Sequence, residues 1–146
     1  MNTAKEILKN KSKEIWSVTP DNTVFEALTL MGEKEIGALM VIDNNAKVQG
    51  IISERDYARK IILLGKTSRD TKVSEIMTPV DKMFTVKPDT TVEDCMVLIT
   101  AKRIRHIPVF DNDQFVGLIS IGDVVKWIIE DQADSIQFLE KYITGR

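Results

Sequence analysis

The sequence is poor in the residues from which catalytic and metal sites are commonly built. Its 146 residues include one cysteine, Cys95, and one histidine, His106. A lone cysteine excludes an internal disulfide bond and a zinc site made of several thiolates, and a lone histidine excludes a metal site that needs two imidazoles. The sequence also has no glycine-rich phosphate loop and no carboxylate cluster suited to a divalent cation, so we expect no metal.

Neither sign of charge is in clear excess, and no hydrophobic run is long. Twenty Lys and Arg residues against 22 Asp and Glu residues give a net charge of −2, whereas a protein held to nucleic acid by its phosphates has a strong basic excess. The aliphatic run Ile61–Leu64 is too short to cross a bilayer, and the first residues lack the pattern of a secretory signal. We therefore expect a cytoplasmic protein with no membrane or nucleic-acid partner.

An internal repeat organises the chain. Residues 18–56 align with residues 86–123 at an offset of 68, which falls to 67 after a one-residue gap at Gln49. Chance alone gives only about two or three identities over such a length. The identical pairs fall at turns and apolar positions, and they are Val18/Val86, Pro20/Pro88, Asp21/Asp89, Thr23/Thr91, Val24/Val92, Lys34/Lys102, Ile36/Ile104, Val41/Val109, Asp43/Asp111, Asn44/Asn112, Gly50/Gly117, Ile52/Ile119, Ser53/Ser120 and Asp56/Asp123.

Each copy predicts the order strand, helix, strand, strand, helix. Thr23 with Glu26, and Thr91 with Asp94, have the spacing of a helix-capping box, and Asp and Asn residues favour the turn of each hairpin. In the first copy the expected elements are a strand at 15–19, a helix from Val24, a hairpin of 38–42 and 48–52, and a helix from Ser53 toward Leu64. In the second they are a strand at 83–87, a helix from Val92, a hairpin of 107–110 and 115–119, and a helix from Ser120 toward Asp131.

A two-repeat organisation follows from these elements. A three-stranded unit of about fifty residues buries little surface by itself, so we expect the repeats to pack with pseudo-two-fold symmetry around one shared core, in a mixed α/β (α+β) fold. The remaining residues divide into extensions and a bridge. The predicted parts are an N-terminal helical extension at 1–14, repeat one at 15–65, a polar bridge at 66–80, repeat two at 81–131, and an amphipathic C-terminal helical tail at 132–146.

Both repeats carry the pattern Gly-x-x-Ser-x-x-Asp where the last helix begins. The candidate residues are Ser53 and Asp56 in the first copy and Ser120 and Asp123 in the second. Backbone N–H groups at a helix start attract phosphate, and a carboxylate one turn into the helix can accept hydrogen bonds from ribose hydroxyls. Ser-x-x-Asp also resembles a capping box, which needs no ligand. The occurrence of two copies at equivalent positions favours the ligand.

Basic residues near these helix starts are candidates for binding phosphate groups. Arg105 and His106 offer hydrogen-bond donors at the start of a strand, although His106 taken alone is better explained as an edge-strand histidine bonded to backbone. Arg55 and Arg59 are four residues apart on one helix, where a solvated face is the alternative. The first repeat has Gly37 and Ala38 in place of Arg105 and His106, so we expect two unequal sites.

Two sulfur-containing residues also need an interpretation. Met77, in the bridge, is a candidate for contact with an adenine ring, with core packing as the alternative. Cys95 falls on the apolar face of its predicted helix, which favours a core residue over a nucleophile.

Four features together point to a known family. They are the doubled unit, the paired Gly-x-x-Ser-x-x-Asp segments, the segment Arg105-His106-Ile107-Pro108-Val109 and the segment Val73-Ser74-Glu75-Ile76-Met77-Thr78. In these features the chain resembles a tandem CBS-domain pair, or Bateman module, of the stand-alone bacterial kind. The resemblance implies that adenosine nucleotides bind in clefts between the repeats, with Ser and Asp from one repeat and strand residues from the other. One implied site combines Ser53 and Asp56 with Thr85, Val86, Ile104, Arg105, His106 and Pro108. The other combines Ser120 and Asp123 with Ser17, Val18, Ile36, Gly37 and Ala38.

Three functions follow as hypotheses. The first is a regulatory module that senses AMP, ATP or NAD, and hence cellular energy, forms a homodimer and passes ligand occupancy to a downstream protein. The second is a purely structural dimerisation module with vestigial sites. The third is a small nucleotide-processing enzyme that uses His106 as its acid or base, for which the sequence offers no partner group; we therefore expect no enzymatic activity.

Overall fold

The computed structural model describes residues 2–11 and 14–144, which divide into two compact units. Residues 14–83 form one unit, which we call the first-repeat unit. Residues 2–11 and 84–144 form the other, which we call the second-repeat unit. The N-terminal segment therefore belongs with the second repeat, although it precedes the first repeat in the chain.

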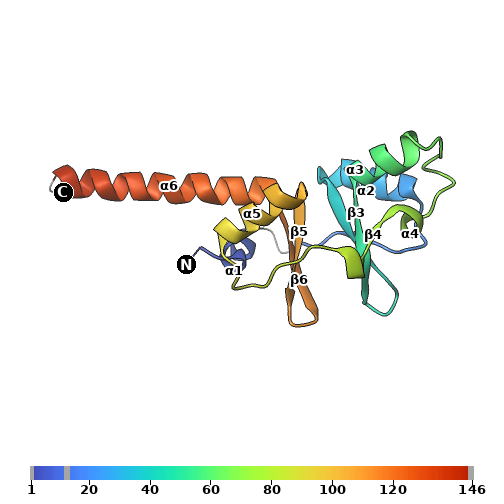
Figure 1. Ribbon diagram of the computed structural model, residues 1–146, viewed down its shortest axis with the longest axis horizontal. Helices are drawn as coiled ribbons and strands as arrows, with labels where there is room; N and C mark the ends of the chain where they lie inside the picture. The colour runs from blue at the N-terminus through green and yellow to red at the C-terminus, as the bar shows by residue number, and fades with distance from the viewer. Residues whose placement is uncertain (1, 12–13, 145–146) are drawn as a thin grey trace. The chain divides into compact units, whose positions relative to one another are not determined.

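The first-repeat unit is a four-stranded sheet with helices packed against it (Figure 1). The strands run in the order β1-β2-β3-β4, with β1 parallel to β2 and the other pairs antiparallel. Its elements are β1 (Ser17–Val18), α2 (Val24–Lys34), β2 (Ala38–Ile42), β3 (Val48–Ser53), α3 (Glu54–Tyr57), a π-helical turn (Ala58–Ile62), α4 (Val73–Ile76), β4 (Thr78–Pro79) and a 3-10 turn (Val80–Lys82).

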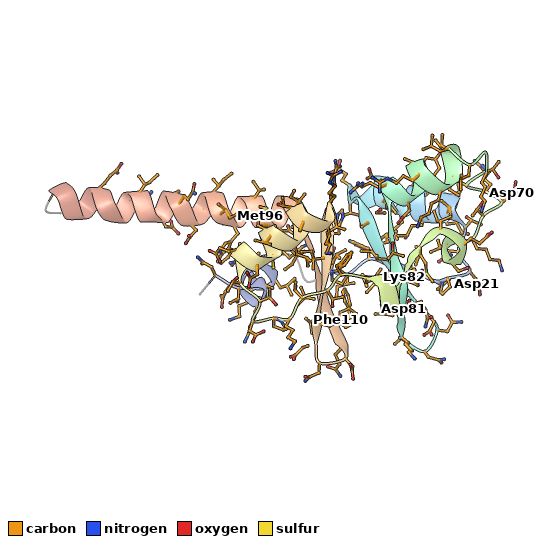
Figure 2. All side chains as sticks on the ribbon, viewed as in Figure 1. Asp21, Asp70, Asp81, Lys82, Met96 and Phe110 are labelled. Atoms are coloured by element: carbon orange, nitrogen blue, oxygen red, sulfur yellow. The ribbon has the colours of Figure 1, made fainter. Side chains whose placement is uncertain are left out.

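The second-repeat unit repeats this plan with a two-stranded sheet. Its elements are α1 (Ala4–Lys9), α5 (Val92–Lys102), β5 (His106–Asp111), β6 (Gln114–Ser120) and α6 (Ile121–Thr144). Phe110 on β5, labelled in Figure 2, meets Phe115 edge to face, with ring centroids 5.7 Å apart. The first strand of the repeat is reduced to one parallel bridge between Val86 and Val109, which matches the pairing of Val18 with Val41.

The predicted helices and hairpins are confirmed, and three boundaries are wrong. The first strand of repeat one is Ser17–Val18 rather than 15–19, and residues 83–87 contain only the Val86 bridge. The last helix does not end near Asp131, because no glycine or proline follows Gly122 within it, and α6 continues as one helix to Thr144 (Figure 1). The predicted tail is thus the second half of α6; the side chains of Leu139, Tyr142 and Ile143 lie outside the described residues.

The strongest departure from the sequence prediction is that α1 and α4 are copies of one another. Val73 N donates to Asn22 O at 2.8 Å and Ser74 N to Pro20 O at 3.1 Å, while Ala4 N donates to Thr90 O at 2.8 Å and Lys5 N to Pro88 O at 2.9 Å. Each acceptor in the first set is the repeat equivalent of an acceptor in the second. The repeating unit therefore begins with this short helix, so the segments expected as an extension and a bridge are parts of the two units.

These short helices contribute to a core within each unit, and the shared core between the repeats stays a prediction. Ala4 and Ile7 are buried in one cluster and Val73 and Ile76 in the other. They add apolar side chains that a fifty-residue repeat lacks, so each unit buries more surface than the sequence prediction assumed. Cys95 lies in the core of the second-repeat unit with none of its surface exposed, and burial raises the pKa of its thiol, as expected for a packing residue.

Candidate functional site

The first candidate corner lies where β3 passes directly into α3. Ser53 has extended backbone angles and caps the helix, because its Oγ accepts from Asp56 N at 3.4 Å while its own N–H donates to Asp56 Oδ2 at 2.9 Å. Lys60, one turn further on, places Nζ 3.2 Å from Asp56 Oδ1 and donates to Ile76 O at 2.8 Å. Ser53 and Lys60 therefore hold the two oxygens of the Asp56 carboxylate in place. The Asp56 side chain is 14% exposed, so it still reaches the surface.

The second candidate corner has the same backbone arrangement where β6 passes into α6. Ser120 N donates to Asp123 Oδ2 at 2.8 Å, and Asp123 N donates to Ser120 Oγ at 3.1 Å. The lysine partner here comes from a different part of the chain: Lys11 Nζ lies 2.8 Å from Asp123 Oδ2 and also donates to Leu118 O at 2.8 Å. The side chains of Lys11 and Asp123 are 35% and 24% exposed.

Both readings of the Ser-x-x-Asp pattern are therefore compatible with the geometry. The reciprocal hydrogen bonds form a capping box at each helix start, as the alternative interpretation predicted. A carboxylate offers about four lone-pair directions, so a capping carboxylate keeps capacity to accept from a further donor. The two carboxylates are partly exposed and fixed in orientation, which is the state required to accept from a pair of ribose hydroxyls.

Within each unit, the strand start predicted to contact a nucleotide lies beside that unit's own corner. In the first-repeat unit Ala38 pairs with Ser53, and Glu54 N donates to Gly37 O at 3.0 Å. In the second-repeat unit the equivalent contacts are His106 with Ser120, and Ile121 N to Arg105 O at 2.8 Å. The backbone is thus the same in both, while the side chains differ as the sequence predicted.

His106 is held neutral by its surroundings. Burial lowers the pKa of His106 to about 4, and the charges of Lys11 and Arg105 add to this effect, whereas Asp123 acts to raise it. At Asp123, burial acts to raise the pKa of the carboxyl, but hydrogen bonds from Lys11 and Ser120 outweigh it and lower the pKa below its ordinary value. The second corner is therefore a coupled set of an ammonium, a carboxylate and a neutral imidazole.

The other predicted site residues occupy three kinds of position. The buried ones are Val18, Val86 and Pro108, and Val86 N donates to Pro108 O at 3.1 Å. The exposed ones are Ser17, Thr85, Arg59 and Arg105. The half-buried ones are Ile36, Ile104, Arg55 and Met77. Ile36, Ile104 and Met77 pack against the two cores. The combination of each corner with strand residues of the other repeat, which the family resemblance implies, stays a prediction.

The glycine of each pattern has a structural reason that the sequence prediction missed. A Cβ at Gly50 would lie 2.4 Å from Thr78 O, and a Cβ at Gly117 would lie 2.6 Å from Leu8 Cδ2. Thr78 belongs to β4, the strand that follows α4 and pairs with β3, and Leu8 lies in α1. Gly50 therefore allows a close approach of β4, and Gly117 a close approach of α1. The matching Glu-Ile pairs, Glu6-Ile7 and Glu75-Ile76, are the only trace of the two equivalent helices that we find in the sequence.

Two further searches bear on the kind of site. Among residues 2–11 and 14–144, no group of three or more His, Cys, Asp or Glu side chains is placed to hold a metal ion. In the same ranges no helix is both long and apolar enough to span a membrane.

The fold and the paired corners define a class of proteins built from two β-α-β-β-α repeats, and comparisons with known proteins identify that class. The family model described as "CBS domain" matches residues 4–63 and 73–130, so each match begins at one of the two equivalent short helices. The chain belongs to the CBS-domain family and is a tandem CBS pair, or Bateman module.

Three relatives illustrate the similarity. The chain is 41% identical over 150 residues to the CBS domain-containing protein CBSX3, mitochondrial, of Arabidopsis thaliana, covering 98% of this chain and 72% of that protein. It is 46% identical, with a TM-score of 0.84, to a putative signal-transduction protein with CBS domains from Burkholderia ambifaria MC40-6, covering 90% and 96%. CBSX2, solved in complex with AMP, shares the fold at a TM-score of 0.73 and 24% identity, covering 90% and 99%.

Proposed function

We propose that this protein is a regulatory module that binds adenine nucleotides, namely AMP, ATP or NAD, at the two Ser-x-x-Asp corners. Binding at a corner changes the surroundings of its helix start, and a partner protein responds to that change. The observation that carries the proposal is the duplication of a partly exposed carboxylate, Asp56 and Asp123, fixed by the same hydrogen bonds one turn into a helix. Family membership supports it, since one structural relative was solved with AMP.

The enzyme hypothesis is weaker because of the state of His106. A general acid or base works best when its pKa lies near the working pH, whereas the pKa of His106 is lowered to about 4. We therefore propose that nucleotides are bound and released unchanged.

The structural hypothesis has one specific observation in its favour. The capping boxes account for Ser53, Asp56, Ser120 and Asp123 without any ligand. A module with vestigial sites would show no stabilisation by nucleotide, whereas a specific ligand at concentrations above its Kd raises the unfolding temperature.

The proposal also includes a homodimer, supported by the surface of α6. Ile121, Val125 and Ile129 lie four residues apart along this helix, and they are 38%, 41% and 60% exposed. Residues at this spacing share one face of a helix, and exposed apolar residues gathered on one face are typical of protein interfaces.

Calorimetric titration with AMP, ATP and NAD tests the nucleotide site. We expect micromolar-range binding to the wild-type protein, with affinity at one corner lost in Asp56→Ala and at the other in Asp123→Ala. A hydrogen bond to a charged group contributes about 1.5–3 kcal/mol, which corresponds to a weakening of roughly ten- to a hundred-fold for each corner.

The control must separate a lost ligand contact from a lost helix cap. Glu26→Ala provides it, because Glu26 forms the same capping box with Thr23 at the start of α2 and belongs to neither Ser-x-x-Asp pattern. We expect Glu26→Ala to lower stability and to leave AMP affinity unchanged. Equal affinities in wild type, Asp56→Ala and Asp123→Ala would refute the assigned sites, and no binding to any of them would refute the function.

A further inference from the structure

The lysine at the second corner has no equivalent in the repeat. By the repeat alignment, Lys60, which pairs with Asp56, corresponds to Trp127, and Lys11, which pairs with Asp123, corresponds to Val80. Each corner carboxylate thus has a lysine partner, but the two lysines are unrelated by the duplication.

The two lysines also approach their carboxylates differently. Lys60 lies four residues after Asp56 on the same helical segment, and it contacts Oδ1, whereas Ser53 N donates to Oδ2. Lys11 lies just after α1, 112 residues away in the chain, and it contacts Oδ2, the oxygen that already accepts from Ser120 N. The contact also joins the N-terminal segment to the start of α6.

The charge of Lys11 acts on two ionisable groups of this corner. It helps to lower the pKa of Asp123 below its ordinary value, and together with burial it lowers the pKa of His106. A ribose hydroxyl that donates to Asp123 therefore meets a carboxylate already compensated by an ammonium group at 2.8 Å. The hydroxyl and the ammonium group then interact with the same negative charge, although Lys11 and Ser120 N both contact Oδ2.

We propose that Lys11 is a specificity-determining residue that competes with the ribose hydroxyls of a nucleotide for Asp123, so that the second corner binds more weakly than its geometry allows. This inference rests on the proposed function, because it concerns affinity at one of the two corners. Nucleotide binding at the second corner therefore has to offset the interaction between Lys11 and Asp123.

The experiment isolates the second corner by removing the first. AMP is titrated into Asp56→Ala and into the double variant Asp56→Ala/Lys11→Met, and Kd is measured by calorimetry. A partly exposed ion pair is a weak interaction, so its loss is expected to tighten AMP binding by about five-fold. The matched control is Asp56→Ala/Lys9→Met, which removes the same charge from an exposed position on α1 and is expected to change nothing.

A readout without nucleotide accompanies the titration. His106 is the one histidine of the chain, so its ring protons are followed by NMR without ambiguity. Lys11→Met is expected to raise the pKa of His106, because a nearby positive charge is removed while Asp123, which stabilises the imidazolium, remains.

Each outcome decides between the inference and the function on which it rests. Tighter AMP binding with a raised His106 pKa supports the competition. Unchanged or weaker AMP binding in the Lys11→Met double variant overturns the competition and leaves the proposed function standing, since weaker binding would make Lys11 a direct ligand contact. An unchanged His106 pKa also overturns it, because Lys11 would then not lie at the corner. No AMP binding by any variant, wild type included, refutes the proposed function and the competition together.

Discussion

Lowering the pH tests whether His106 is buried as the structure describes. The pKa of His106 is lowered from its ordinary value of 6.5 to about 4, first by burial and then by Lys11 and Arg105, with Asp123 opposing. Between these two pH values the unfolded chain binds a proton at this ring and the folded chain does not. Stability is therefore highest above pH 6.5, falls as the pH decreases toward 4, and loses nothing further from this group below that.

The magnitude follows from the gap between the two pKa values. Each pH unit of separation is worth about 1.4 kcal/mol, so His106 removes about 3 kcal/mol of stability between pH 7 and pH 4. Native carboxylates titrate in the same range, so the measurement is a comparison of urea unfolding of wild type and His106→Gln at several pH values. The difference in unfolding free energy between the two proteins is expected to change by about 3 kcal/mol across this window.

NMR titration of the folded protein gives an independent check. An imidazole pKa of about 4 with a matching change in the stability difference supports the reasoning. A His106 pKa near 6.5, or wild-type and His106→Gln curves that stay parallel with pH, would refute it, because the ring would then be solvated and Lys11 would not lie beside it.

Two further predictions concern packing and assembly. Gly50→Ala is expected to lower the free energy of unfolding by about 1–3 kcal/mol, because the new Cβ would meet Thr78 O, a backbone atom that cannot turn away. Gly32→Ala lies in an exposed part of α2 with open space around it, and it is expected to raise the free energy of unfolding by about 1 kcal/mol. The opposite order of the two variants in urea unfolding would contradict the packing around Gly50. Ile129→Lys, at a 60% exposed position of α6, is expected to lower the mass measured by light scattering from dimer to monomer, and an unchanged dimer would place the interface elsewhere.

The sequence was sufficient for the elements whose signals are local. The capping box of Thr23 with Glu26 fixed where α2 begins, and the apolar runs on either side of an Asp-Asn turn fixed both hairpins. Asn112 has the positive φ of 55° that such a turn favours, although in the first hairpin the residue with positive φ is Ala46. Local rules succeed here because each uses residues only a few positions apart.

The sequence was insufficient where distant segments meet. In the sequence, the equivalence of α1 and α4 shows only as two adjacent identical residues outside the aligned repeat, which are too few to stand out from chance. The pairing of Lys11 with Asp123 joins residues 112 positions apart, and no periodicity extends that far. The length of α6 was underestimated because the first repeat ends its last helix near Gly65, where φ is 70°, and repeat two has no such residue.

The most direct test of the central claim compares AMP with its 2′,3′-dideoxy analogue in calorimetric titrations of the wild-type protein. If the carboxylates of Asp56 and Asp123 accept hydrogen bonds from the vicinal ribose hydroxyls, the analogue is expected to bind at least roughly ten- to a hundred-fold more weakly, since the loss of a single hydrogen bond to a charged group costs about 1.5–3 kcal/mol. Equal affinities for AMP and the analogue would contradict the account, because the two corners would then play no part in recognising the sugar.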